Sequence, residues 1–251
     1  MSAPSWASSF GAVAVDVDGA TAWVTLDRPD AANARNQAMR DELKTTWSSM
    51  AADPSISVVV LTAAGDRFFC AGMDLKEAGA PETPAERRDR LRSSRDIEQL
   101  AALPQPTIAA INGYALGGGL EMALACDLRI VAESAQVGLT ELVHGLVPGG
   151  GGTQRLPRLI GVAKAAELLF TGRRLTGPEA ESWGLVNRCV PFDDLRKTTA
   201  ELAATIADKD GRALRYAKEL LRKSQEVSVA VGADAELDAL LTLMAERNAA
   251  G

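Results

Sequence analysis

Hydrophobic and polar residues alternate in short runs over the first sixty positions of the chain. Two such runs, Ala12–Asp16 and Ala20–Leu26, flank an Asp-Gly pair, which is typical of a β-hairpin. Asn36 is suited to cap a helix over Gln37–Ala51. The apolar, β-branched run Ser57–Thr62 is typical of a buried strand. The chain therefore begins as a mixture of strands and helices.

The middle of the chain continues this alternation. The segment Thr83–Glu86 has a capping residue, a proline at the first helical position and a glutamate at the third, and it predicts a helix that runs to about Leu103. A buried strand is predicted over Thr107–Asn112, a short apolar helix over Leu120–Ala125, and another strand over Leu128–Ala132. This order of strands and helices predicts an α/β core.

The end of the chain has a helical pattern. We expect three helices there, over Asp193–Ala207, Gly211–Ser224 and Ala233–Arg247. We therefore divide the chain into an α/β core of residues 1–191 and a helical C-terminal part of residues 192–251. Four apolar residues on the last helix have the spacing of a face that becomes buried: Leu237, Leu240, Leu241 and Met244.

Composition and charge narrow the possible partners. The chain has 251 residues and a net charge of −6, so we expect no nucleic-acid partner. No apolar run approaches the roughly 18 residues that span a membrane, and the first residues have no pattern of a secretory signal. The three cysteines have no C-x-x-C spacing and fit reduced core thiols. These features predict a cytoplasmic protein that does not associate with membranes.

Several common chemistries have no matching motif in this sequence. There is one histidine, His144, which argues against a histidine-rich metal site and fits a structural role better. The nucleophile elbow GxSxG, the dinucleotide motif GxGxxG and the phosphate loop GxxxxGK[ST] are all missing. We therefore expect neither a metal nor a bound nucleotide cofactor.

Two glycine-containing segments are candidates for the reactive site. Phe68–Lys76 follows a buried strand, and Asn112–Glu121 runs from a strand through three glycines into a helix. The first N–H groups of a helix have no partner within it, and the helix dipole adds about half a positive charge there. Such a helix start can hold a developing oxyanion, although the same pattern also fits a tight packing turn.

Two glutamates accompany these segments. Glu121 lies within the apolar helix Leu120–Ala125, where a buried carboxyl group is costly unless it has a partner and is suited to general acid–base chemistry. Glu141 comes shortly before a second glycine cluster, Gly149–Gly152. From the residues alone, Glu141 equally fits a helix cap or a solvent-exposed position.

These segments together resemble the enoyl-CoA hydratase/isomerase, or crotonase, superfamily. That family has patterns close to FxAGxDLKE, NGxAxGGGxExAxxCD and GLxPGxGGTQRLPRxIG, with a glutamate-containing segment between the last two, and this sequence has all four in order. The resemblance covers most of Ala12–Pro191. It implies an α/β fold built as a spiral of repeated ββα units, with a helical C-terminal part that forms homotrimers, commonly stacked into homohexamers.

The resemblance also implies roles for individual residues. The backbone N–H groups of Met73 and Gly118 would hold the thioester oxygen, and Glu121 and Glu141 would hold the water that adds to a trans-2-enoyl-CoA. The product would be a 3-hydroxyacyl-CoA of fatty acid or related acyl-CoA catabolism. Coenzyme A would arrive with the substrate, and no other cofactor is implied. Four positions match the coenzyme A channel of relatives: Ala31, Ala71, Asp74 and Leu75.

Other interpretations remain open at this level. Asp74 also fits a turn-forming residue. A 3,2-enoyl-CoA isomerase needs only one well-placed base and would use the same oxyanion site, and other acyl-CoA reactions occur on this fold. A non-catalytic protein that binds acyl-CoA or RNA is a further alternative, but the acidic charge argues against RNA.

The sequence departs from the family pattern at several positions. Thr140 stands where hydratases often have a proline, and this difference bears on the orientation of the Glu141 side chain. Asp30 and Arg35 replace the commoner basic and apolar residues of their segment. Relatives usually end in a segment resembling EGxxAFxEKRxPxF that helps to cover the coenzyme. This sequence ends without such a segment, so we expect weaker binding of coenzyme A.

Overall fold

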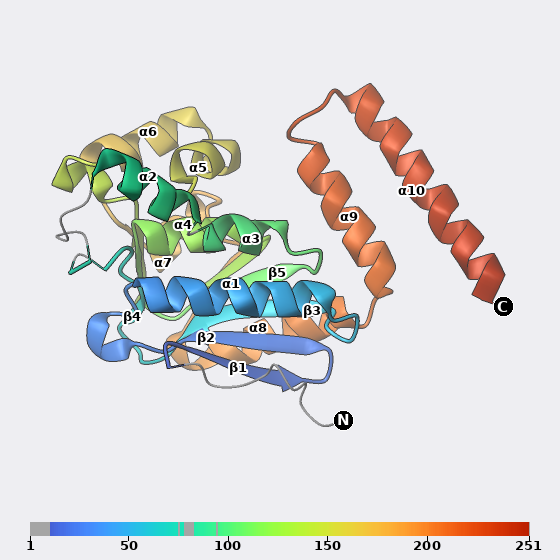
Figure 1. Cartoon of the computed structure of the whole chain (residues 1–251), viewed down its shortest axis with the longest axis horizontal. Coiled ribbons are helices and arrows are strands. Elements are labelled where there is room, and N and C mark those ends of the chain that lie inside the picture. Colours follow the sequence, from blue (N-terminus) through green and yellow to red (C-terminus); the bar gives the residue numbers. More distant parts are fainter. Residues whose placement is uncertain (1–10, 75, 78–82, 94, 251) are drawn as a thin grey trace.

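The computed structural model describes residues 11–74, 76–77, 83–93 and 95–250 (Figure 1). These residues form a six-stranded sheet, a separate four-stranded sheet, and helices that cover both. The expected α/β class is confirmed by this arrangement. In the described part of the chain, no helix is both long and apolar enough to cross a membrane.

The predicted hairpin forms the edge of the six-stranded sheet. Strands β1 (Val13–Asp18) and β2 (Thr21–Leu26) are antiparallel, and Asp18 lies opposite Thr21. Gly19 in the turn has a φ of 59°, which glycine adopts without strain. The Asp-Gly signal in the sequence is therefore confirmed.

Parallel strands make up the rest of this sheet. Next to β2 come β3 (Val58–Ala63), β5 (Thr107–Ile111), β7 (Leu128–Ala132) and β10 (Arg188–Val190), in that order. The strands β3, β5 and β7 are almost entirely buried, which explains why they read as continuous apolar runs. All three were predicted from the sequence.

The smaller sheet arises because a second strand follows each of these three. Strands β4 (Phe68–Cys70), β6 (Tyr114–Leu116) and β8 (Gln136–Gly138) lie parallel to one another, and β9 (Leu175–Thr176) pairs with β8 in the antiparallel direction. The chain thus alternates between the two sheets in repeated units. This agrees with the spiral of ββα units that the resemblance implies.

Helix α1 (Gln37–Ala52) begins where the sequence predicts. The side chain of Asn36 accepts a hydrogen bond from the backbone N–H of Met39 over 2.9 Å. The buried face of the helix includes Leu43 and Trp47, which pack into the core.

The single helix predicted from Pro84 to Leu103 is wrong, because the chain forms two helices there. Helix α2 (Pro84–Ser93) ends before Arg95, whose φ of −88° and ψ of 42° are not helical, and α3 (Asp96–Ala102) begins immediately afterwards. The described side chains of α2 are exposed, whereas Asp96 and Ile97 at the start of α3 are buried. The two helices pack differently, so no continuous apolar stripe joins them.

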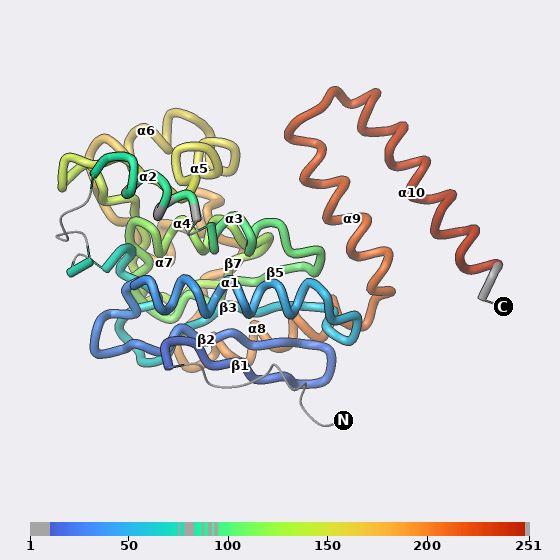
Figure 2. The backbone as a smooth tube through the Cα atoms, viewed as in Figure 1, coloured from blue at the N-terminus to red at the C-terminus, as the bar shows by residue number. Residues whose placement is uncertain are grey.

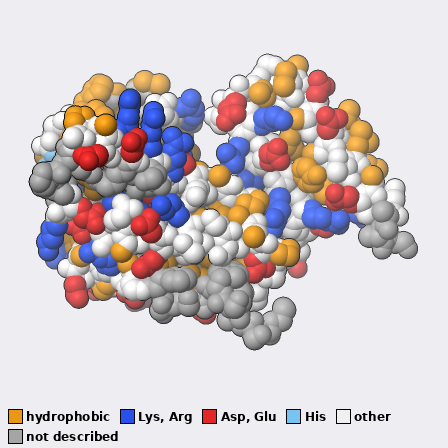
Figure 3. Space-filling view, viewed as in Figure 1, with side chains coloured by type: hydrophobic (Ala, Val, Ile, Leu, Met, Phe, Trp, Pro, Cys, Tyr) orange, Lys and Arg blue, Asp and Glu red, His pale blue; other side chains and the backbone are white. Residues whose placement is uncertain are grey.

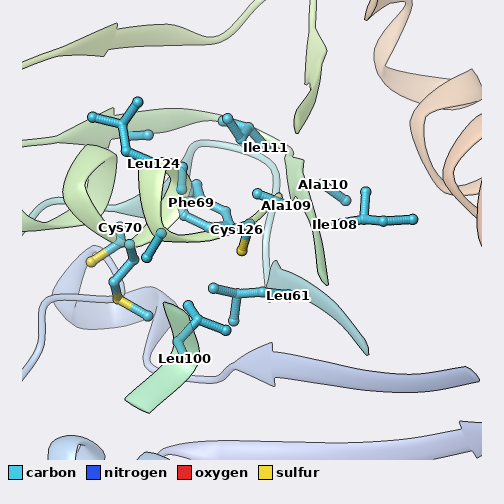
Figure 4. Packing of buried hydrophobic residues seen from close by; sticks show 14 of the residues in the cluster. Leu61, Phe69, Cys70, Leu100, Ile108, Ala109, Ala110, Ile111, Leu124 and Cys126 are labelled. Atoms are coloured by element: carbon cyan, nitrogen blue, oxygen red, sulfur yellow. The ribbon is translucent and has the colours of Figure 1, made fainter. Parts of the chain in front are cut away.

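Four further helices lie between the strands and near the small sheet. They are α4 (Gly118–Ala125), α5 (Gly152–Ile160), α6 (Val162–Thr171) and α7 (Gly177–Ser182). Helix α4 is buried along nearly its whole length. Figure 4 shows part of the core around it, which includes Leu61 of β3, Phe69 of β4, Leu100 of α3 and Leu124 of α4.

The C-terminal helices differ in how they contact the core. Helix α8 (Phe192–Ala207) packs against the six-stranded sheet, while α9 (Gly211–Lys223) and α10 (Val229–Ala250) pair with each other and extend away from the body (Figure 2). The boundary between residues 191 and 192 stays a prediction. The four apolar residues of α10 are each more than half exposed, and hydrophobic side chains are visible along this helix in Figure 3.

Candidate active site

Two loops meet at glycines beside the small sheet. A Cβ atom placed on Gly72 would lie 3.0 Å from the carbonyl oxygen of Leu116 and 3.2 Å from the backbone nitrogen of Gly118. Gly72 also has a φ of 98°, so both its conformation and its surroundings require glycine. A Cβ on Gly119 would lie 2.8 Å from the carbonyl carbon of Cys70. The loop after β4 and the start of α4 are therefore in direct backbone contact.

The two predicted oxyanion donors lie on these two loops. Arg35 and Met73 form a parallel β-bridge, in which the N–H of Arg35 donates to the oxygen of Gly72 over 2.8 Å and the N–H of Asp74 donates to the oxygen of Arg35 over 3.1 Å. This pattern directs the N–H of Met73 away from the bridge. Gly118 is the first residue of α4, so its N–H has no partner within the helix. The structure thus brings both donor segments together.

Glu121 is buried in the first turn of α4 and held by the second glycine cluster. Its Oε1 atom accepts hydrogen bonds from the backbone N–H groups of Gly150, over 2.7 Å, and Gly152, over 2.8 Å. A Cβ on Gly150 would lie 2.7 Å from Oε2, which explains why the backbone here needs glycine. A Cβ on Gly118 would lie 3.9 Å from the same Oε2. One carboxylate oxygen is therefore anchored, and the other faces Gly118.

Glu141 reaches the same place from a different element. It begins a 3-10 helix (Glu141–His144), and its Oε1 atom lies 3.2 Å from where a Cβ on Gly117 would be. Its Oε2 atom is buried and has no hydrogen-bond partner among the described residues. Burial, opposed by a backbone hydrogen bond and reinforced by the charge of Glu121, raises the pKa of Glu141 to about 6. This carboxyl group can therefore take up and release a proton near neutral pH.

Both glutamates thus face one Gly-Gly step. Glu141 lies at Gly117 and Glu121 lies at Gly118, beside the helix start that carries one of the two predicted oxyanion donors. Thr140, which replaces the usual proline, has a φ of −104° and makes no side-chain capping bond. Glu141 still points toward Gly117 with this residue before it.

The structure places some of the residues expected to line the coenzyme A channel, but not all of them. Ala31 ends a 3-10 helix (Pro29–Ala31), and the N–H of Ala71 donates to the oxygen of Ala32 over 3.1 Å, which joins the two loops. Leu75 lies outside the described residues. The role of these positions in binding coenzyme A stays a prediction.

Asp74 is engaged by its own loop and by the loop after β2. Its carboxylate accepts hydrogen bonds from the guanidinium of Arg28 and from the N–H of Lys76, each over 3.1 Å. Burial acts against ionisation, but these two hydrogen bonds outweigh it and lower the pKa of Asp74. The contacts favour the turn-forming interpretation of this residue.

A residue without a predicted role also reaches the site. Arg35 is only 9% exposed, and a Cβ on Gly118 would lie 3.0 Å from its Nη1 atom. The other side of its guanidinium group forms a two-point ion pair with Asp96, with Nε–Oδ2 at 3.1 Å and Nη2–Oδ1 at 2.6 Å. Burial works against the charge of Arg35, but Asp96 outweighs it and raises the pKa of Arg35. In the sequence, Arg35 was marked only by being a basic residue where the family pattern commonly has an apolar one.

Metal ligands do not gather here within the part of the chain that the structure describes. No three His, Cys, Asp or Glu side chains among these residues come together as a metal site would need. His144 lies at the end of the 3-10 helix that Glu141 begins, and its side chain is exposed.

Comparison with known proteins places this geometry in a family. The family model described as enoyl-CoA hydratase/isomerase matches residues 16–249. The chain is 46% identical over 211 residues to YngF of Bacillus subtilis, and the match covers 84% of this chain and 81% of YngF.

Solved structures agree with the sequence comparison. An enoyl-CoA hydratase from Bacillus anthracis is 42% identical and superposes with a TM-score of 0.89, covering 93% of this chain and 91% of that one. A Thermobifida fusca structure in complex with CoA is 31% identical, with a TM-score of 0.88 and 94% of each chain covered. The chain belongs to the enoyl-CoA hydratase/isomerase (crotonase) family.

Proposed function

We propose that this protein is an enoyl-CoA hydratase, which adds water to a trans-2-enoyl-CoA thioester to give a 3-hydroxyacyl-CoA. The observation that carries the proposal is that Glu121 and Glu141 face adjacent glycines, Gly118 and Gly117, beside a helix start. Addition of water needs one group that activates the water and one that delivers a proton to carbon. Two carboxyl groups at one Gly-Gly step meet both needs.

The proposed reaction begins with the thioester oxygen accepting hydrogen bonds from the N–H groups of Met73 and Gly118. Glu121 takes a proton from the water while the water oxygen bonds to C3, and the electrons of the double bond move toward the thioester oxygen. The resulting enolate is stabilised by the two N–H groups, each worth about 2.7–4 kcal/mol. Glu141 then delivers a proton to C2. Its raised pKa, about 6, supports this role.

The substrate class follows from the family. A crotonase-family reaction uses an acyl-CoA thioester, and the related Thermobifida fusca structure contains CoA. We propose that coenzyme A enters only as part of the substrate and that the residues above need no metal or redox cofactor. The acidic net charge of −6 supports neither RNA binding nor another nucleic-acid role.

A 3,2-enoyl-CoA isomerase is the second candidate. It is favoured by one observation, namely that Glu141 alone, with its pKa of about 6, could move a proton between two carbons. Such an enzyme would leave Glu121 without a chemical task. Glu121 is buried and held by two backbone hydrogen bonds, which supports a chemical role for its carboxylate and therefore favours the hydratase.

We also propose that the protein forms homotrimers or stacked homohexamers through its C-terminal hairpin and that it acts in the cytoplasm. The support for assembly is the exposed apolar face of α10, where Leu240 and Leu241 are each 55% exposed. Isolated monomers rarely expose such a row of large apolar side chains.

One experiment separates the two activities. The purified protein is supplied with crotonyl-CoA, in which hydration removes the conjugated absorbance, and separately with a 3-enoyl-CoA, in which isomerisation creates it. The hydratase proposal predicts rapid loss of absorbance with crotonyl-CoA and slow or no gain with the 3-enoyl-CoA. The reverse pattern would replace it with the isomerase.

A further inference from the structure

Arg35 brings a positively charged hydrogen-bond donor into a site that otherwise contains carboxylates. The Nε and Nη2 atoms bind Asp96, and among the described residues Nη1 has no hydrogen-bond acceptor. The two N–H groups of Nη1 are thus available on the side of the guanidinium that faces Gly118.

The position of Nη1 is set by a rigid support. Asp96 is fully buried and begins α3, and the backbone of Arg35 is bonded to Gly72 and Asp74 on the donor loop. The Nη1 atom and Oε2 of Glu121 both lie within 4 Å of the point where a Cβ on Gly118 would be. The free donor therefore lies beside both the oxyanion helix and one catalytic carboxylate.

An unpaired donor that is accessible at the site affects which ligands fit. When a plain hydrocarbon chain displaces water from Nη1, the two N–H groups lose their acceptors and binding is weakened. An acyl group with its own oxygen at that point restores a charge-assisted hydrogen bond. Sites built to hydrogen-bond a substrate atom discriminate strongly against analogues that lack the atom.

We propose that Arg35 is a specificity-determining residue that selects acyl-CoA thioesters with a neutral oxygen, such as a keto or hydroxyl group, close to the thioester. This inference rests on the proposed acyl-CoA function but not on the addition of water. A carboxylate at the same point is disfavoured, because Asp96 already balances the charge of Arg35 and Glu121 lies beside Nη1. A second anion there would add uncompensated negative charge.

The test compares the binding of two thioesters that do not need to react. Acetoacetyl-CoA and butyryl-CoA differ by the oxygen on C3, and succinyl-CoA adds an anionic acyl group. Calorimetry gives the dissociation constants for the wild-type protein and for the double variant Arg35→Met/Asp96→Leu. The double variant replaces the whole buried ion pair with apolar side chains, because removal of one partner alone would leave a buried charge and endanger folding.

A control removes another ion pair, beyond the far end of α4, in which the lysine is buried and the aspartate is exposed. Lys218 and Asp127 are joined over 2.7 Å, and Lys218 is 6% exposed. The variant Lys218→Met/Asp127→Leu makes the same change of charge away from the site. Circular dichroism is used to check that both double variants are folded.

The proposal predicts that wild-type protein binds acetoacetyl-CoA at least about tenfold more tightly than butyryl-CoA. This preference falls by about tenfold or more in Arg35→Met/Asp96→Leu and is unchanged in the control. If Arg35→Met/Asp96→Leu keeps the preference for acetoacetyl-CoA, the Arg35–Asp96 ion pair is only structural and the proposal is overturned. Tighter binding of succinyl-CoA than of acetoacetyl-CoA by the wild-type protein would also overturn it. If the wild-type protein prefers acetoacetyl-CoA as predicted but does not hydrate crotonyl-CoA, the hydratase proposal is overturned and this inference stands.

Discussion

The backbone N–H of Gly152 donates a hydrogen bond to Oε1 of Glu121 over 2.8 Å, and Gly150 donates a second to the same oxygen over 2.7 Å. These two bonds connect the glycine cluster at the start of α5 to the first turn of α4. Glycine is needed at both positions because a Cβ on Gly150 would lie 2.7 Å from Oε2 of Glu121 and one on Gly152 would lie 3.1 Å from Oε1. The cluster fixes one carboxylate oxygen and leaves the other free for chemistry.

Replacement of Gly150 by alanine tests this support. Its new Cβ would lie 2.7 Å from both Oε2 of Glu121 and Cδ1 of Ile97, so the carboxylate must shift. Because a displacement of about 1 Å can cost about 10²-fold in rate, we expect kcat for crotonyl-CoA hydration to fall by roughly that factor. Gly149→Ala is the matched control, since no atom lies within 4 Å of its Cβ position. Equal activities for the two variants would show that the support is unimportant.

The raised pKa of Glu141 predicts a dependence of stability on pH. A carboxyl group whose pKa rises from 4.5 to about 6 on folding favours the folded state when protonated and opposes it when ionised. Its stabilising effect is therefore complete below pH 4.5 and is lost as the pH rises through about 6. We expect Glu141→Gln to be more stable than wild type at pH 8, by roughly 1 kcal/mol after allowance for partial exposure, with little difference at pH 4.5.

Urea unfolding at the two pH values measures this difference. We also expect the stabilised variant to have lost hydration activity, because the group that destabilises the fold is the one proposed to act in the reaction. A variant less stable than wild type at pH 8 would contradict the assigned effect of burial on the pKa.

The exposed face of α10 predicts how the protein assembles. Leu237 and Leu241 lie one helical turn apart and are 54% and 55% exposed. The double variant Leu237→Asp/Leu241→Asp would place charges on this face and is expected to convert the proposed trimer or hexamer into monomers. Analytical ultracentrifugation distinguishes these states. An assembly that is unaffected by the change would locate the subunit contact elsewhere.

Much of the fold follows from local sequence pattern. The Asp-Gly hairpin, the Asn36 cap and the buried strands β3, β5 and β7 depend on turn chemistry and on continuous apolar runs, and all were predicted. The small-sheet strands were not predicted as strands, because each has two or three residues and exists only through pairing with distant segments. The break before α3 depends on the burial of Asp96, which local pattern does not reveal.

The candidate site, too, was predicted only in part from local sequence pattern. The glycine-rich helix start and the apolar setting of Glu121 identify part of the site from the residues themselves, whereas Glu141 required the family resemblance. Arg35 was visible only as a departure from a pattern. Its partner Asp96 lies 61 residues further along the chain, so no spacing rule connects the two.

The two-glutamate hydration is tested most directly by the rate of crotonyl-CoA hydration by the wild-type protein beside Glu121→Gln and Glu141→Gln, which keep the shape of each side chain. We predict wild-type turnover and a loss of about 10²–10⁴-fold in each single variant, with both variants still folded and still able to bind acetoacetyl-CoA. Retention of wild-type turnover by either variant would contradict the assignment of both glutamates to the addition of water.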